Sequence, residues 1–154
     1  MDAVYRLTSA ILGNEADARD AAQETFIAVW RQLRRLREPE KFDAWLQRVA
    51  VNASRMMIRA RSRRRIREIP SSRVVALGER AADSLRDDAA ILDAALATLR
   101  VEQRAILVLH HLEGRSLAEL ATILDIPEGT AKSRLFAARR ALAAAITAAE
   151  ERDR

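Results

Sequence analysis

The 154-residue sequence carries 27 Lys and Arg against 22 Asp and Glu, a formal net charge of +5, and an isoelectric point near 10.8. It contains no cysteine, which excludes disulfides and thiolate chemistry. Hydrophobic residues make up 49% and aromatic residues 4%, with four Gly and three Pro, so we expect an all-α globular chain with an aliphatic core. The basic balance points to a polyanionic partner, either nucleic acid or an anionic membrane.

The N-terminus lacks a basic leader followed by an apolar segment, and no apolar run approaches membrane-spanning length. We therefore expect a cytoplasmic protein without membrane insertion. The length suits one domain, but two small helical units joined by a linker would also fit.

The first long helix is predicted to start after Asn14, whose side chain can cap it, with Asp17 at the third helical position. Apolar residues then recur every three or four positions, as one face of an amphipathic helix requires. They are Ala18, Ala22, Phe26, Val29, Leu33 and Leu36. We expect the helix to end before Pro39, which disfavours helix at the preceding residue and lacks a backbone donor.

A second helix is predicted after the short loop 37–41, with helical spacing of Phe42, Trp45, Leu46, Val49, Ala50, Ala53, Met56 and Ala60. It runs into residues 59–67, where six of nine residues are Arg (59, 61, 63, 64, 65 and 67) and none is acidic. A cationic helix end exposed to solvent and a surface that binds a polyanion both fit this run. The charge pattern alone leaves the two readings open.

Residues 67–88 carry no sustained apolar stripe and include Pro70, Ser71 and Ser72, so we expect a flexible linker between two cores. The expected domains are therefore 1–66 and 89–150. In the second domain, two helices are predicted from Ile91, Leu92, Ala95, Leu96 and Leu99, and from Ile106, Leu107, Leu109 and Leu112. The second of these stops at Gly114.

The segment 116–142 predicts a helix-turn-helix. Ser116 and Glu119 form a capping box that opens the short helix "LAELATIL", and the turn "DIPEG" separates it from a second helix. Asp125 occupies the turn position where glycine is commonest, and aspartate tolerates the left-handed conformation required there. The second helix carries Ala131, Leu135, Ala138 and Leu142 on one face and basic residues on the other, as a major-groove reader must.

Three blocks together resemble the bacterial sigma factors of the sigma-70 family, most closely the small extracytoplasmic-function (ECF) group. Residues 17–30 look like the region-2 helix that docks on the coiled coil of the polymerase β′ subunit. Residues 42–65 look like the adjoining helix that faces the minus-10 element, and residues 99–142 look like region 4, which reads the minus-35 element. The sequence departs from the family pattern at Met56, Arg100 and Ala137, and its opening region-2 helix looks short.

The resemblance implies three groups of binding residues. Core polymerase would be bound by Asp20, Gln23 and Glu24, on the face opposite the Ala22 and Phe26 stripe, through carboxylates that pair with basic residues of the partner coiled coil. Minus-10 DNA would be bound by Arg37, Lys41, Asn52, Arg59, Arg63, Arg64 and Arg65, and the loop 37–41 would capture a flipped base. Minus-35 DNA would be bound by Thr130, Lys132, Ser133, Arg134 and Arg139. An anti-sigma factor is a further candidate partner, and no cofactor is implied.

Phe42 and Trp45 could stack on unpaired bases, but their register with Val49 and Ala53 favours a core role. His110 and His111 suggest a metal or acid–base site. However, adjacent helical residues point to different faces, and no second ligand cluster has metal spacing. We therefore expect neither a metal site nor catalysis. Two further classes stay open: a helix-turn-helix regulator that acts without forming a polymerase holoenzyme, and a helical protein-interaction module that binds no DNA.

Overall fold

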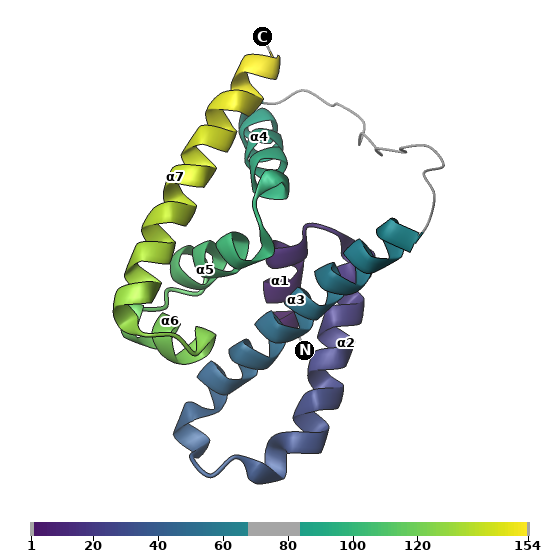
Figure 1. Cartoon of the computed structure of the whole chain (residues 1–154), viewed down its shortest axis with the longest axis vertical. Coiled ribbons are helices and arrows are strands. Elements are labelled where there is room, and N and C mark those ends of the chain that lie inside the picture. Colours follow the sequence, from purple (N-terminus) through teal and green to yellow (C-terminus); the bar gives the residue numbers. More distant parts are fainter. Residues whose placement is uncertain (1, 68–83, 154) are drawn as a thin grey trace.

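The computed structural model describes the backbone of residues 2–67 and 84–153 and the side chains of residues 2–63 and 88–152. Helices make up this part of the chain, without strands (Figure 1). They are α1 (Asp2–Leu12), α2 (Glu15–Gln32), α3 (Phe42–Arg67), α4 (Ser84–Thr98), α5 (Val101–His111), α6 (Leu117–Leu124) and α7 (Glu128–Asp153), with short 3-10 helices η1 (Leu33–Arg35) and η2 (Pro39–Lys41). The all-α prediction is confirmed.

The first unit packs α1, α2 and α3 against one another (Figure 1). The Asn14 side chain accepts a hydrogen bond from the Asp17 backbone N–H at 3.0 Å, so the predicted cap opens α2. Gly13 ends α1 with φ +64°, a conformation that glycine adopts without strain. The short first helix is well anchored, because Val4, Leu7 and Ile11 are all buried.

The α2–α3 connection forms one tip of the molecule (Figure 1). α2 ends at Gln32, before Pro39 as predicted, and the two 3-10 turns lead into α3. The apolar stripe of α2 is buried only in its first half: Ala18 and Ala22 are buried, whereas Leu33 is 47% exposed. The apolar stripe therefore extends beyond the surface of α1 and α3 against which α2 packs.

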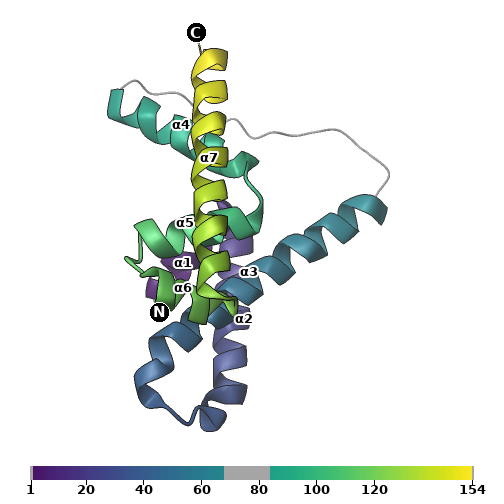
Figure 2. The same cartoon turned by 60° about the vertical axis from the view of Figure 1, so that its left-hand side comes forward.

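The second unit is built on α7. α4 lies beside the C-terminal half of this long helix, while α5 and α6 pack at its N-terminal end (Figures 1 and 2). Ala95 and Leu99 of the α4 segment and Ala149 of α7 are buried. The first and last helices of the unit, α4 and α7, therefore pack against each other.

The predicted helix-turn-helix is confirmed in α6 and α7. The Ser116 hydroxyl accepts from the Glu119 N–H, and the Glu119 carboxylate accepts from the Ser116 N–H at 2.8 Å, which forms the expected capping box. Asp125 follows α6 with φ 56° and ψ 52°, the left-handed conformation expected in the turn. Ala131, Leu135 and Ala138 are buried, so α7 turns the expected face inward.

The two helical units expected from the sequence are present, and their cores are in contact with each other. Buried side chains from both units form one connected cluster, in which Val4, Leu7 and Val51 belong with Leu109 and Leu120. α1 contacts α5, and α3 contacts both α5 and α6. Periodicity identifies the apolar face of each helix but does not say which unit will cover it.

Both ends of the interval 67–88, expected as a linker, are helical in the structure. α3 continues to Arg67, and α4 already begins at Ser84, five residues before the expected domain start at 89. The rest of that interval, including Pro70, Ser71 and Ser72, lies outside the described residues.

Candidate nucleic-acid and partner-binding surfaces

The first candidate surface is the outer face of α7 at its N-terminal end. Lys132, Ser133 and Arg134 are exposed, whereas the neighbouring Ala131 and Leu135 are buried. Thr130 is half-buried, and the Ser133 hydroxyl donates to its carbonyl at 3.0 Å. Two cations therefore project from a helix whose position is set by apolar packing on the opposite side.

Arg139, also expected at this surface, is engaged within the protein. Its Nε donates to Nε2 of His111 at 3.3 Å, which ties α7 to the end of α5. Burial lowers the pKa of His111, and the charges of His110 and Arg139 act in the same direction. A neutral His111 is the form that can accept this hydrogen bond. Arg139 lies farther from the start of α7 than Lys132 and Arg134 do, and its side chain already has His111 as a hydrogen-bond partner.

His110 also has a structural partner, since its Nδ1 lies 2.8 Å from the Arg115 carbonyl. Although adjacent helical residues diverge, the His110 and His111 rings meet edge to face, with centroids 4.8 Å apart. Within the described residues, no cluster of three or more His, Asp or Glu side chains could hold a metal ion.

The capping box of α6 is reinforced by a cation. Arg115 Nη1 donates to the Glu119 carboxylate at 2.9 Å. The backbone N–H of Ser116, followed by the Arg115 side chain, holds the pKa of Glu119 below its usual range. The ionised form of Glu119 therefore fixes the start of the helix that supports α7.

The second candidate surface is on α2. Asp20, Gln23 and Glu24 are all exposed, as expected. However, Gln23 is not opposite the Ala22 and Phe26 stripe, because it lines the same groove as both residues. Residues three apart are neighbours on a helix, which places Gln23 beside Phe26. Asp20 and Glu24 lie outside the groove lining.

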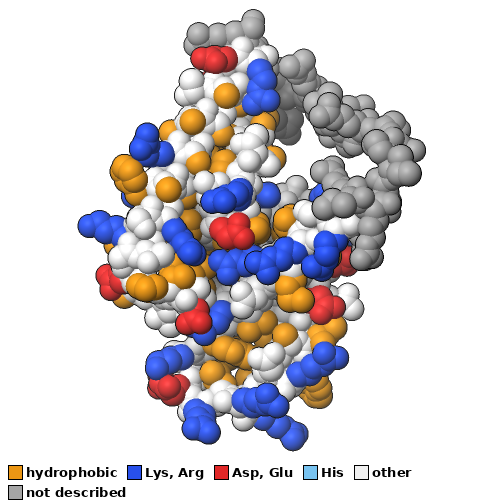
Figure 3. All heavy atoms as spheres, viewed as in Figure 1, with side chains coloured by type: hydrophobic (Ala, Val, Ile, Leu, Met, Phe, Trp, Pro, Cys, Tyr) orange, Lys and Arg blue, Asp and Glu red, His pale blue; other side chains and the backbone are white. Residues whose placement is uncertain are grey.

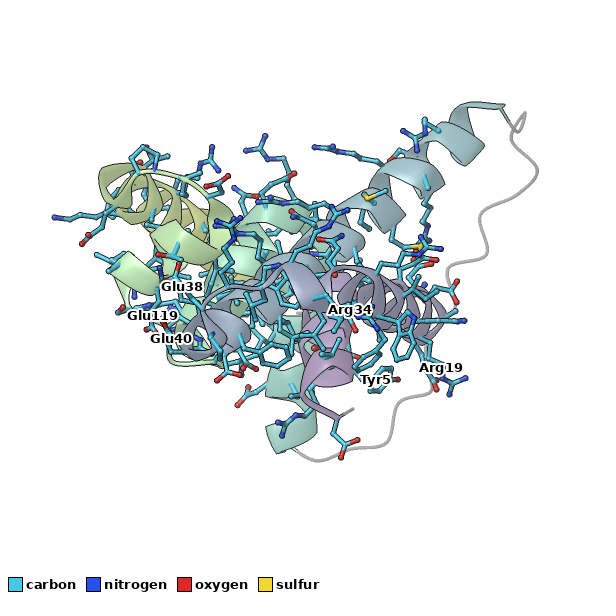
Figure 4. All side chains as sticks on the ribbon, turned by 90° about the horizontal axis from the view of Figure 1, so that it is seen from below. Tyr5, Arg19, Arg34, Glu38, Glu40 and Glu119 are labelled. Atoms are coloured by element: carbon cyan, nitrogen blue, oxygen red, sulfur yellow. The ribbon has the colours of Figure 1, made fainter. Side chains whose placement is uncertain are left out.

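That groove runs between α1 and α2 and has a volume of about 1160 Å³. Its lining combines apolar and polar side chains: Asp2, Tyr5, Glu15, Arg19, Ala22, Gln23, Phe26, Ile27, Trp30 and Arg31. Tyr5 and Arg19 project side by side at its rim (Figure 4). Trp30 is 86% exposed, although tryptophan normally buries most of its surface. Trp30 does not belong to the apolar stripe predicted for this helix, and that position could have signalled its exposure.

The third candidate surface follows the α2–α3 connection and α3. Arg37, Lys41, Asn52, Arg59 and Arg63 are exposed. Lys and Arg side chains gather at the lower tip of the molecule, over this connection (Figure 3). Arg64 and Arg65 belong to α3, but their side chains lie outside the described residues.

A groove of about 350 Å³ lies beside the connection and is lined by Arg37, Lys41, Trp45 and Arg48, among others. Trp45 and Phe42 are half-buried, with ring centroids 6.0 Å apart. Trp45 therefore packs in part and also borders two of the expected DNA-binding residues. A hydrogen bond from Lys41 to the Glu38 carboxylate raises the pKa of Lys41, so this lysine stays charged.

The α3 surface holds one basic residue that sequence reasoning missed. Arg55 is half-buried, and burial lowers its pKa, with Arg134 and Arg59 adding to that effect against the influence of Glu102. The charge of Arg134 on α7 thus acts on Arg55 of α3. No local pattern signals this proximity, because the two residues are far apart in the sequence.

Among the described residues, no helix combines the length and the apolarity needed to cross a bilayer.

Two sequence families match the chain, one on each unit. "Sigma-70 region 2" matches residues 1–64, and "Sigma-70, region 4" matches residues 89–142. The two helical units and their order therefore define a transcription initiation factor of the sigma-70 class.

Comparison with individual relatives places the chain in one group within the sigma-70 class. The chain is 38% identical over 145 residues to the ECF RNA polymerase sigma factor SigE of Mycolicibacterium smegmatis, covering 92% of this chain and 56% of that protein. It is 30% identical over 152 residues to the ECF RNA polymerase sigma factor SigW of Bacillus subtilis, covering 92% of this chain and 81% of that protein. The chain belongs to the ECF sigma factors of the sigma-70 family.

The fold is also that of a solved sigma factor. The sigma factor RpoE from Bartonella quintana, in complex with the anti-sigma factor NepR, aligns with a TM-score of 0.69 and 22% identity. The alignment covers 95% of this chain and 91% of that one. The likeness extends over both helical units.

Proposed function

We propose that this chain binds core RNA polymerase through its first unit and directs it to promoters with a minus-10 and a minus-35 element. The observation that carries the proposal is the order of the two family matches on one chain, region 2 at residues 1–64 and region 4 at residues 89–142. A regulator that works without polymerase needs a helix-turn-helix but has no use for a region-2 unit.

The polymerase contact is assigned to α2. Asp20 and Glu24 are exposed carboxylates on one side of this helix and can pair with basic side chains of the β′ coiled coil. The neighbouring groove adds Phe26 and the 86% exposed Trp30, and aromatic side chains of this kind often supply much of the energy of an interface. Acidic residues beside an exposed aromatic groove suit a basic, amphipathic helical partner.

Minus-10 binding is assigned to the α2–α3 connection and to α3. Arg37 and Lys41 flank the groove that Trp45 borders, a place where a flipped base could lie against an aromatic ring. Asn52, Arg59 and Arg63 continue along the exposed side of α3, and the run continues in sequence with Arg64 and Arg65. Their charges would act mainly on phosphates, without reading sequence.

Minus-35 binding is assigned to the first turns of α7. Lys132 and Arg134 project outward, and Thr130 and Ser133 lie near the helix N-terminus, where free backbone amides favour a phosphate. We assign Arg134 to the edge of a DNA base and Lys132 to the phosphate backbone of the DNA. Arg139 holds His111, so it plays a positioning role in addition to any contact with DNA.

The remaining assignments follow from this role. The protein works as a binding subunit and carries no catalytic residue of its own. It acts in the cytoplasm, where bacterial transcription takes place. An anti-sigma factor is a proposed partner, because the solved RpoE chain with a similar fold was captured with the anti-sigma factor NepR.

The test is run-off transcription with purified core polymerase, the full chain and a library of promoter fragments. We expect transcripts only when both proteins are present, from templates that share two sequence elements upstream of the start site. Core polymerase alone serves as the baseline. DNA binding by the chain without co-elution with polymerase would instead favour a regulator that forms no holoenzyme.

A further inference from the structure

A groove of about 390 Å³ lies where α3 passes the start of α5. Its cationic lining residues come from both units: Arg59 and Arg63 belong to α3, and Arg100 directly precedes α5. All three side chains are exposed. Pockets that hold small ligands measure about 300 to 1,000 Å³, so this groove is large enough for a compact molecule.

The rest of the groove lining decides which kind of molecule fits. Ile58 is half-buried and Val101 is buried, so the groove has an apolar wall, and Ser62 adds a hydroxyl. Among the described lining residues, the three guanidinium groups outnumber the single carboxylate, that of Glu102. Charges beside an apolar wall attract each other more strongly than charges surrounded by water. The lining therefore favours a ligand that carries negative charge.

Further positive charge surrounds the groove. Arg55 lies one turn before Arg59, and its buried Nε has no hydrogen-bond partner among the described residues. Burial lowers the pKa of Arg55, and the charges of Arg134 and Arg59 add to this effect against the influence of Glu102. Residues four apart are neighbours on a helix, so Arg55, Arg59 and Arg63 form one stripe. Lys and Arg side chains form a row across the middle of the molecule, over α3 (Figure 3).

This concentration of charge selects the ligand by chemistry. Like charges held close together repel one another, and a bound anion relieves that repulsion. The planar guanidinium group matches the oxygens of a phosphate group and can bind two of them at once. An anion with one small charged group can pair with only one or two arginines. A chain of linked phosphates offers enough oxygens to reach the α3 stripe and Arg100 together.

We propose that the groove lined by Arg59, Arg63 and Arg100 binds a small anion of linked phosphate groups. The phosphate backbone of DNA offers the same oxygens, so the experiment has to separate a free polyphosphate from DNA. Arg59, Arg63 and Arg134 are also assigned to promoter DNA. A polyphosphate in the groove therefore competes with DNA for these arginines, a consequence that rests on the proposed function.

The experiment is a calorimetric titration of the full chain with inorganic tripolyphosphate at physiological ionic strength. We expect saturable binding of one tripolyphosphate per chain. A parallel titration uses a short DNA duplex that contains neither promoter element. When the duplex carries a fluorescent label, tripolyphosphate should displace it over the concentration range in which tripolyphosphate itself binds.

Arg63→Gln combined with Arg100→Gln removes one guanidinium group from each unit. We expect tripolyphosphate to bind about tenfold or more weakly, because each hydrogen bond to a charged group contributes roughly a factor of ten or more. Arg6→Gln combined with Arg152→Gln removes the same charge at exposed positions outside the groove lining and should bind like the parent chain. If the first variant loses helicity by circular dichroism, Arg100→Gln alone replaces it, since Arg100 joins the hydrogen bonds at the start of α5 through its backbone.

Two results would overturn the site. Several weak tripolyphosphate binding events per chain, or equal weakening in the control variant, would mean an adventitious charge interaction only. Duplex binding that weakens in the groove variant, without saturable tripolyphosphate binding by the parent chain, would assign these arginines to DNA alone. Neither titration uses polymerase or a promoter. Failure of the proposed function would therefore appear as absent run-off transcripts with tripolyphosphate binding intact.

Discussion

Leu135 and Arg134 are adjacent on α7. We predict that truncating Leu135 lowers the stability of the fold, whereas truncating Arg134 weakens promoter binding. Leu135 is 4% exposed within the shared core, so Leu135→Ala removes packed atoms and leaves a cavity. Such truncations cost about 2 to 5 kcal/mol in the free energy of unfolding. For a chain of this size, that corresponds to a fall in melting temperature of about 5 to 20 °C.

Arg134→Ala should leave the melting temperature nearly unchanged, because the Arg134 side chain is exposed. It should instead weaken binding to the upstream promoter element by about 1 to 3 kcal/mol and relax preference at one base pair. Thermal melting and promoter footprinting of both variants check the pair together. The assignment of the two faces of α7 would be refuted if Leu135→Ala melted like the parent chain, or if Arg134→Ala bound every promoter site normally.

Three further predictions concern the other surfaces. Asp20→Lys with Glu24→Lys should abolish co-elution with core polymerase while circular dichroism stays helical, whereas Glu150→Lys with Glu151→Lys, at the far end of α7, should co-elute normally. Replacing Arg63, Arg64 and Arg65 by Gln should weaken open-complex formation on all promoters alike and reduce the salt slope by up to about 3; a changed promoter preference with the same slope would contradict phosphate binding. The pKa of Glu119 in the folded chain is lowered from its ordinary value. The ionised carboxylate therefore stabilises the folded state at pH values above the ordinary glutamate pKa, and this stabilisation is lost as the pH falls through the lowered pKa. The stability gap between the parent chain and Glu119→Ala should therefore shrink on acidification, and a gap independent of pH would exclude the ionised cap.

The features that could be predicted from sequence are those set by neighbouring residues. The Asn14 cap, the Ser116 and Glu119 capping box and the left-handed Asp125 each depend on residues within one turn of the chain. The inward face of α7 follows from the spacing of Ala131 and Leu135, because helical periodicity decides which residues point the same way. These local signals were enough to define the helix-turn-helix.

The features that could not be predicted depend on contacts between distant segments. Gln47 accepts a hydrogen bond from Arg115, which is 68 positions away in the sequence, and nothing near either residue indicates the other. Arg104 would be expected to reach solvent, as arginine usually does, yet its Nη1 donates to the Leu12 carbonyl at the end of α1. The groove on α2 also depends on such contacts, because the packing of α1 leaves Phe26 partly open instead of burying the whole stripe. The position of Gln23 beside Phe26, by contrast, follows from helix geometry alone.

The pairing of α4 with the far end of α7 has a mechanical consequence. α7 is one continuous 26-residue helix with the proposed base-reading residues at one end and the packing site of α4 at the other. If the helix tilts as a rigid lever about its α6 end by about 10°, the opposite end, about 39 Å away, moves by about 7 Å. If α7 binds DNA as proposed, a small change in its tilt at the DNA-binding end would therefore displace α4 by a larger distance.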